Sequence, residues 1–202
     1  MIAVIDYGAG NLKSVTKALH YLDFESEIVS DPKGLEQADA LILPGVGAFP
    51  KCMAALEKSG MAGAIPAQVL DKQKPLLGIC LGMQMLLDES EEMGKTAGLG
   101  LIPGRVERID TALKLPHIGW NSLKILHDNP LTAGLSQGDC VYFVHSFCAK
   151  TANPADCAMT TDYGTEVTAM VARGNIFGCQ FHPEKSGDVG LHILKNFGEL
   201  NP

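Results

Sequence analysis

The stretch PLLGICLGMQ, residues 75–84, joins an apolar segment typical of a buried strand to a segment typical of a helix. Cys80 stands at the junction, with Gly78 and Gly82 two residues away on either side. Glycines allow a sharp turn here because they carry no Cβ atoms to collide with the neighbouring backbone. A cysteine between two glycines at a strand-to-helix turn predicts a nucleophile elbow. This pattern alone is equally compatible with a core cysteine in a tight turn.

Strand-like and helix-like segments alternate along the first half of the chain. Strands are predicted at residues 2–6, 26–30, 39–45 and 75–80, and helices at 12–22, 51–58, 65–72 and 83–87. Such alternation predicts a parallel sheet covered on both faces, with the carboxyl ends of its strands along one edge. A helix after Cys80 would offer N–H groups and a dipole that favour a thiolate.

The pattern changes after Gly98. The segments GLIPGRVERI, VYFVHSF, EVTAMVA and NIFGCQF are strand-like and separated by turns, and a last helix is predicted at 188–200. We expect this half to be antiparallel and to extend or flank the sheet. No repeat or long linker divides the chain, so the prediction is one domain, residues 1–202, with a mixed α/β fold of parallel core and antiparallel extension.

Composition excludes several classes of function. A net charge of −7 disfavours binding to nucleic acid. No apolar run approaches the roughly 18 residues of a membrane helix, and no signal peptide is recognisable at the N-terminus. The six cysteines form no CxxC pair, which disfavours a zinc or dithiol site. We expect no metal, no cofactor, no membrane contact, a cytoplasmic location and free thiols that mostly pack in the core.

A base for the elbow cysteine is predicted in CQFHPE, residues 179–184. His182 and Glu184 lie two residues apart in what we expect to be extended chain, so both side chains project to the same side. Glu184 would then accept the imidazole Nδ1–H and leave Nε2 to serve the sulfur. By itself this triplet would more often be a surface loop.

GICLGMQ followed far downstream by QFHPE resembles the class I (triad) glutamine amidotransferases, and the resemblance covers nearly the whole chain. It implies a flavodoxin-like fold and a glutaminase. In such an enzyme Cys80 attacks the side-chain amide of glutamine, His182 carries the proton to the leaving ammonia, and Glu184 orients His182. The thioester is then hydrolysed to glutamate.

Further motifs narrow the resemblance. DYGAGN, LPGVGAF, PHIGWN, YFVHSF and HPEKS together are similar to the glutaminase subunits of imidazole glycerol phosphate synthase, which act in histidine biosynthesis. PHIGWN and PGVGAF are the most specific of these. The implied partner is a (β/α)8-barrel cyclase subunit, which receives the ammonia in a heterodimer.

Two N–H groups should bind the oxygen of the tetrahedral intermediate. One is expected on Leu81, directly after the nucleophile. The other is expected on Val46, between Gly45 and Gly47, where peptides turn over at low steric cost. We hypothesise that the Val46 N–H turns inward only when the partner binds its ligand, which would keep the isolated chain nearly silent. An ordinary Pro-Gly turn is the alternative.

The resemblance also assigns residues to substrate and partner. Gln84, one helical turn after Cys80, is expected to hold the amino-acid end of glutamine, with Glu92 meeting the ammonium and the main chain of His145, Ser146 and Phe147 completing the pocket. For Glu92, a solvated acidic run is a strong alternative. The implied partner-facing residues are Asn11, Trp120, Tyr142 and Lys185. Trp120 stands in an expected Gly-Trp-Asn turn, where a core anchor is nearly as plausible.

Three other functions compete with this one. A second possibility is a glutaminase subunit for another synthase, such as those of pyridoxal phosphate or anthranilate synthesis, and PHIGWN and DYGAGN count against it. A third is an elbow-cysteine stress protein, redox protein or peptidase on a similar sheet, against which QFHPE and Gln84 count. A purely structural role would require Cys80→Ala to leave glutamine-dependent synthesis intact.

Overall fold

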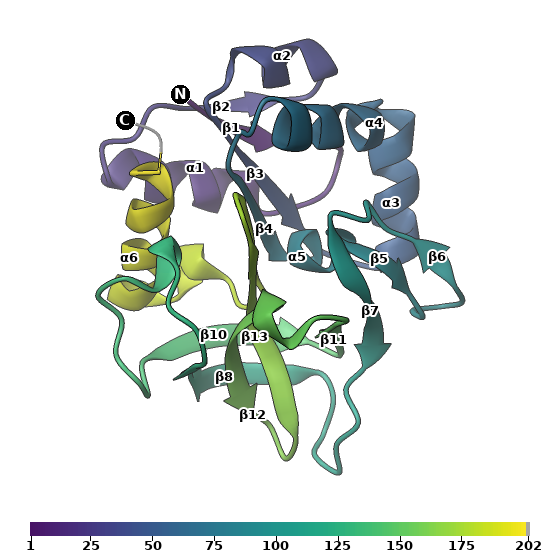
Figure 1. Cartoon of the computed structure of the whole chain (residues 1–202), viewed down its shortest axis with the longest axis vertical. Helices are drawn as coiled ribbons and strands as arrows, with labels where there is room; N and C mark the ends of the chain where they lie inside the picture. Colours follow the sequence, from purple (N-terminus) through teal and green to yellow (C-terminus); the bar gives the residue numbers. More distant parts are fainter. Residues whose placement is uncertain (201–202) are drawn as a thin grey trace.

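An eight-stranded mixed sheet runs through the structure, a computed structural model that describes residues 1–200 (Figure 1). Its order is β2 (Ser26–Val29), β1 (Ile2–Ile5), β3 (Ala40–Gly45), β4 (Leu76–Cys80), β14 (Ile176–Cys179), β13 (Glu166–Arg173), β12 (Cys157–Asp162) and β9 (Lys124–Ile125). The first five strands are parallel, and the remaining pairings are antiparallel.

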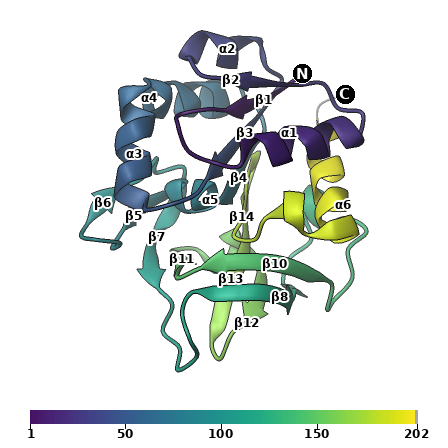
Figure 2. The same ribbon diagram turned by 180° about the vertical axis from the view of Figure 1, so that it is seen from behind.

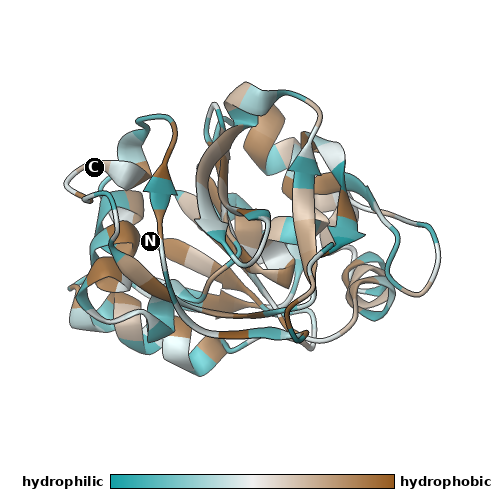
Figure 3. Ribbon diagram, turned by 90° about the horizontal axis from the view of Figure 1, so that it is seen from below, coloured by the Kyte–Doolittle hydropathy of each residue, from teal (hydrophilic) through white to brown (hydrophobic). Residues whose placement is uncertain are grey.

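Helices cover both faces of the parallel strands. One face holds α1 (Leu12–Tyr21) and α6 (Gly187–Gly198), and the other holds α2 (Pro32–Gln37), α3 (Phe49–Lys58), α4 (Met61–Pro66) and α5 (Leu81–Met85). Strand β1 divides its side chains between the two cores, since Ile2 and Val4 join one cluster and Ala3 and Ile5 join the other. In Figure 3 the strands through the middle of the molecule are accordingly largely hydrophobic.

Two smaller sheets flank this core. One contains β11 (Phe147–Thr151), β7 (Ile102–Arg108), β5 (Leu87–Ser90) and β6 (Thr96–Ala97) in that order, and the other is the two-stranded ribbon of β10 (Cys140–His145) and β8 (His117–Ser122) seen in Figure 2. Short helical turns are η1 (Ala67–Asp71), η2 (Pro130–Thr132), η3 (Pro154–Asp156) and η4 (Pro183–Lys185). The predicted mixed α/β fold is confirmed.

Several local predictions were wrong. Strand β14, expected in an antiparallel half, pairs with β4 in parallel and extends the parallel core by one strand. The helix after the elbow occupies Leu81–Met85, because Leu87 already begins strand β5. The helix expected at 65–72 begins at Met61 and ends in the π-helical turn η1, and α2 was not predicted.

Cysteine placement follows the prediction in part, since Cys157, expected to pack in the core, is only half-buried. All six thiols are free, and Cys52, Cys148 and Cys179 are buried. Cys140 is exposed, contrary to the expectation that it packs inside. Within residues 1–200 no helix has both the length and the apolar character needed to span a bilayer.

Candidate active site

Cys80 ends strand β4 in a backbone conformation that few L-residues adopt, with φ 55° and ψ −111°. Strained backbone of this kind persists only where the surrounding packing holds it. Here β4 lies between β3 and β14, and residues 81–85 are buried directly beyond the turn. The turn therefore presents the sulfur at the carboxyl edge of the sheet.

Both flanking glycines are required by close approach. A Cβ atom at Gly82 would lie 1.8 Å from the carbonyl oxygen of Leu43, and one at Gly78 would lie 2.7 Å from the backbone of Gly82 and Met83. Real Cβ atoms do not approach backbone atoms at such distances. The predicted reason for the Gly-x-Cys-x-Gly pattern is thus confirmed by the packing of β3 and β4 on α5.

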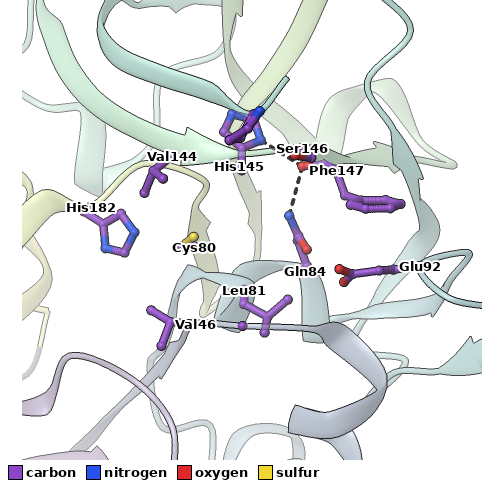
Figure 4. Close-up of a pocket in the computed structure, with 12 residues that line it drawn as sticks. Val46, Cys80, Leu81, Gln84, Glu92, Val144, His145, Ser146, Phe147 and His182 are labelled. Atoms are coloured by element: carbon purple, nitrogen blue, oxygen red, sulfur yellow. Dashed lines mark hydrogen bonds between the residues drawn. The ribbon is translucent and has the colours of Figure 1, made fainter. Parts of the chain in front are cut away.

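His182 and Glu184 form a buried pair beside Cys80. His182 Nδ1 and Glu184 Oε1 are 2.9 Å apart, and their side chains are 3% and 1% exposed. The backbone between them is the 3-10 turn η4 rather than the expected extended chain, yet the hydrogen bond forms as predicted. Figure 4 shows a ring nitrogen of His182 turned toward the sulfur of Cys80.

Backbone contacts hold the turn that carries this histidine. The His182 N–H donates to the Tyr142 carbonyl at 3.0 Å, and the Ser186 hydroxyl donates to the His182 carbonyl at 2.7 Å. The same hydroxyl accepts from the Tyr142 N–H at 3.0 Å. Strand β10 therefore fixes the position of the imidazole.

The charges around His182 favour its protonated form. Burial lowers the pKa of His182, but the neighbouring Cys80 thiol and Glu184 carboxylate outweigh burial and raise that pKa to about 9. The second carboxylate oxygen of Glu184 is buried and accepts no hydrogen bond from the described residues, so the contact of Oε1 with His182 is the only hydrogen bond found for this carboxylate among them. The site can therefore hold His182 as an imidazolium near neutral pH, with a ring nitrogen turned toward the Cys80 sulfur.

A cavity of about 360 Å³ opens above Cys80 (Figure 4). Its lining includes every predicted substrate, oxyanion and nucleophile residue, with His182 at one side. The lining residues are Val46, Gly47, Cys80, Leu81, Gln84, Glu92, Pro116, Val144, His145, Ser146, Phe147 and His182. Glu184 lies behind His182. Gly47, Pro116 and Val144 were not predicted as lining residues.

Gln84 and Glu92 on the cavity wall differ in how deeply they are buried. Gln84 is 3% exposed, and its amide Nε2 donates to the Phe147 carbonyl at 3.0 Å and to Gln180 Oε1 at 2.9 Å. Glu92 is half-buried, and its Oε2 accepts the Phe49 N–H at 2.8 Å at the start of α3. Glu92 is thus not part of a freely solvated acidic run.

The segment after β10 is held by a buried histidine pair. His145 Nδ1 lies 2.8 Å from the Phe147 carbonyl, and His145 Nε2 lies 3.2 Å from His117 Nδ1. Because a carbonyl only accepts, His145 carries its proton on Nδ1 and accepts from His117 through Nε2. Burial, aided by the nearby His117 and His182, lowers the pKa of His145 to about 4.

Two side-chain hydrogen bonds hold the segment around Val46. The Cys52 thiol donates to the Val46 carbonyl at 3.3 Å, and the Tyr7 hydroxyl donates to the Pro44 carbonyl at 3.0 Å. Gly47 has φ 104°, and Val46 is 44% exposed at the cavity mouth. The inward turning of the Val46 N–H stays a prediction.

Three of the four predicted partner-facing residues gather on one surface. Trp120 and Tyr142 are paired across the β8–β10 ribbon with ring centroids 6.2 Å apart, and exposed Lys185 follows in η4, which β10 contacts. Trp120 is 59% exposed and lies in strand β8, so both the expected turn and the core-anchor alternative are wrong. Asn11 precedes α1 and is half-buried.

Three buried polar residues close to the site received no role from sequence reasoning. Tyr7 stands in DYGAGN but had no role assigned, and His117 and Gln180 lie in quoted motifs without one. A polar residue inside an apolar strand-like run is the available signal for Gln180, which is fully buried.

Comparison with known proteins agrees with this geometry. The family model Glutamine amidotransferase class-I matches residues 3–199. The imidazole glycerol phosphate synthase subunit HisH of Caldanaerobacter subterraneus subsp. tengcongensis is 52% identical over 201 residues, covering 99% of this chain and 98% of that protein. The subunit of the same name from Methanothermobacter thermautotrophicus is 50% identical over 200 residues, covering 99% and 98%.

A solved structure shares the fold at lower identity. The structure of PurLQS from Thermotoga maritima matches with a TM-score of 0.79 at 21% identity, covering 98% of this chain and 97% of that one. The chain belongs to the class-I glutamine amidotransferase family and, within it, to the family of HisH subunits of imidazole glycerol phosphate synthase.

Proposed function

We propose that this chain is the glutaminase subunit of an imidazole glycerol phosphate synthase. It hydrolyses glutamine to glutamate and ammonia, and the ammonia serves histidine biosynthesis in the partner subunit. The observation that carries this proposal is the buried His182–Glu184 pair, 2.9 Å apart, facing the elbow cysteine across one cavity. Identity of about half the residues with HisH proteins over nearly the full chain supports it further.

In the first half-reaction the Cys80 thiolate attacks the side-chain carbonyl carbon of glutamine. A carbon–sulfur bond forms, and the carbonyl oxygen becomes an oxyanion. The His182 imidazolium then gives its Nε2 proton to the leaving nitrogen, so ammonia departs and a γ-glutamyl thioester remains. Glu184 accepts from Nδ1 throughout and stabilises the imidazolium.

In the second half-reaction water replaces ammonia. His182, now neutral, takes a proton from the water as it attacks the thioester carbonyl. The carbon–sulfur bond breaks, the new carboxyl group loses the second proton of the water to solvent, and glutamate leaves as the thiolate–imidazolium pair is restored. The oxyanion of both steps is bound by the N–H groups of Leu81 and Val46, which is supported by the position of both residues on the cavity lining.

The amino-acid end of glutamine binds on the far side of the cavity. The Gln84 carbonyl oxygen and the Glu92 carboxylate accept from its ammonium, and the main chain of residues 145–147 meets its carboxylate. Support comes from Gln84, whose two N–H groups are already used within the protein, so that Oε1 is the part left for a ligand.

A (β/α)8-barrel cyclase subunit is the proposed partner. Support comes from the exposed apolar residues Ile118 and Trp120 on β8, beside half-buried Tyr142 and Val144 on β10. Aromatic residues of this kind anchor protein interfaces. Lys185 adds a charged contact and Asn11 a polar one. The free thiols suit a reducing compartment, and we place the complex in the cytoplasm.

Glutamate release from glutamine tests the function. We expect slow release by the chain alone and a large rise when the cyclase and its nucleotide substrate are added. Cys80→Ala should abolish release in both conditions. Fast release by the chain alone would be consistent with the glutaminase activity but would refute the hypothesis that the Val46 N–H turns inward only with the partner. No release by a folded chain in either condition would refute the function.

A further inference from the structure

Gln180 is a buried amide at the end of strand β14, directly before the turn that carries His182. Its side chain is 0% exposed, and its backbone N–H donates to the Ala169 carbonyl at 2.9 Å, which continues the pairing of β14 with β13. Burying an amide is unfavourable unless both its ends find hydrogen-bond partners. Those partners identify what Gln180 does.

Both ends of the Gln180 amide meet the proposed active site. Oε1 accepts from Gln84 Nε2 at 2.9 Å, and Nε2 lies 3.9 Å from the Cys80 sulfur, within donor distance for a sulfur acceptor. Gln180 thus joins the nucleophile to the residue that lines the substrate pocket.

The direction of donation along this series of hydrogen bonds is fixed at its far end, by the carbonyl of Phe147. The Phe147 carbonyl can only accept, so the Gln84 atom 3.0 Å from it is the amide nitrogen. The same nitrogen must donate its second hydrogen to Gln180, which requires Gln180 to present oxygen to Gln84 and nitrogen to Cys80. His145, which donates to the same carbonyl, holds that end in place.

We propose that Gln180 is a positioning residue for the glutaminase reaction, holding the Cys80 sulfur through its N–H and Gln84 through its oxygen. This proposal rests on the proposed function. An N–H group beside sulfur is attracted more strongly to a thiolate than to a thiol. Gln180 therefore favours the reactive form of Cys80 and sets its direction, and it keeps the substrate residue in register with the nucleophile.

Two substitutions separate these contacts. Gln180→Met has a similar length and removes both the donor and the acceptor, while Gln180→Glu keeps an acceptor for Gln84 and removes the N–H beside the sulfur. The matched control is Asn175→Ala at the opposite end of β14. Its side chain donates to the Val69 and Lys74 carbonyls at 2.9 and 2.8 Å, far from Cys80 in the strand.

The readout is the pH dependence of Cys80 alkylation by iodoacetamide, followed at the Cys80 peptide by mass spectrometry because Cys140 is exposed to the reagent as well. We expect the midpoint to rise by about one pH unit in both variants, a roughly tenfold loss of thiolate at pH values below the midpoint. Asn175→Ala should lower the unfolding temperature and leave the midpoint unchanged.

Glutaminase kinetics of the complex give a second readout. Gln180→Glu should lower kcat with KM within about twofold of wild type, and Gln180→Met should also raise KM, since Gln84 loses its support. Variants that unfold at a lower temperature, like Asn175→Ala, but keep the wild-type midpoint and kcat would overturn the proposal.

The wild-type chain supplies a readout that needs no variant. The side-chain amide NMR resonances of Gln180 should move as Cys80 titrates, and resonances that stay fixed would overturn the proposal. Alkylation requires no glutamine. A wild type with normal alkylation and no glutamate release would therefore refute the proposed function and not the contact of Gln180 with sulfur.

Discussion

Gly82 packs against the Leu43 carbonyl so closely that a Cβ atom would come within 1.8 Å of that oxygen. The oxygen belongs to the buried strand β3, which is paired on both sides and cannot yield. The elbow therefore depends on the absence of one methyl group.

Gly82→Ala is expected to destabilise the chain by about 3 kcal/mol or more, because either β3 or α5 must move. Denaturant unfolding measures this. Gly63→Ala is the control, since Gly63 lies exposed in α4 with nothing within 4 Å of its Cβ position. That change should stabilise by about 0.4–1 kcal/mol. Equal stabilities of the Gly82 variant and wild type would contradict the packing.

The pH dependence of glutaminase activity should report His182. Its pKa is raised to about 9, so the imidazolium is present at neutral pH and is lost as pH rises through about 9. Activity should fall over that range. The same shift stabilises the fold fully below about pH 6.5, and this contribution is lost toward pH 9.

Glu184→Gln removes the carboxylate that supports the imidazolium. The alkaline limb of the activity profile should move to lower pH, and kcat should fall. His182→Ala should lower kcat by roughly 10²–10⁴-fold. An alkaline limb in Glu184→Gln that coincides with that of wild type would show that another group controls it.

His145 predicts loss of stability in acid. Burial lowers its pKa to about 4, below the unfolded value of about 6.5, so unfolding takes up a proton between these values. Stability should fall as pH drops from about 6.5 to 4, by up to about 3 kcal/mol. His145→Gln should flatten this slope, whereas His127→Gln, at an exposed position, should leave it unchanged. A slope unaffected by either change would exclude His145 as its source.

Substitution of Trp120 should affect binding of the cyclase but not the stability of the chain. Because its side chain is exposed, Trp120→Ala should barely change stability, but it should weaken binding of the cyclase by roughly 2 kcal/mol, about 30-fold. Isothermal titration calorimetry measures the affinity. Leu70→Ala is the control, since Leu70 is 52% exposed in η1, before β4 begins and thus at the other edge of the sheet. Equal weakening by both changes would mean that no specific surface is involved.

Gly47→Pro addresses the predicted turning of the Val46 peptide. Gly47 has φ 104°, which proline cannot adopt, so the segment should become rigid in another conformation. Stimulation of glutamate release by the partner and its ligand should be lost, while Cys80 alkylation continues. Undiminished stimulation would refute the turning.

The parts of the site that follow from local pattern were predictable from sequence. The elbow and the His182–Glu184 contact each lie within a few residues, where glycine spacing and chain geometry suffice. The parallel place of β14 beside β4 was not predictable, because about 100 residues separate them and only packing selects the pairing. Gln180 was missed for the same reason, since its partners lie 96 and 100 residues away.

Local pattern did not indicate the exposure of Trp120, which only the resemblance implied by placing it among the partner-facing residues. Strand β8 alternates buried His117 with exposed Ile118 and Trp120 around Gly119, and its short glycine-containing motif reads as a turn. Only the pairing with β10 shows that one face of the ribbon has no covering layer among the described residues.

Tyr142 contributes both to the exposed aromatic surface of the β8–β10 ribbon and to the support of His182. Its side chain lies beside Trp120 on the exposed face of the β8–β10 ribbon, while its N–H donates to Ser186 and its carbonyl accepts from His182, the two residues that flank η4. Evolution of the surface around Trp120 and Tyr142 is therefore constrained by the need to keep His182 in place. Adaptation to a changing partner can exchange side chains at this position, but an insertion or deletion in β10 would displace the imidazole with it. The length of β10 is therefore constrained by the position of His182 as well as by the exposed face of the ribbon.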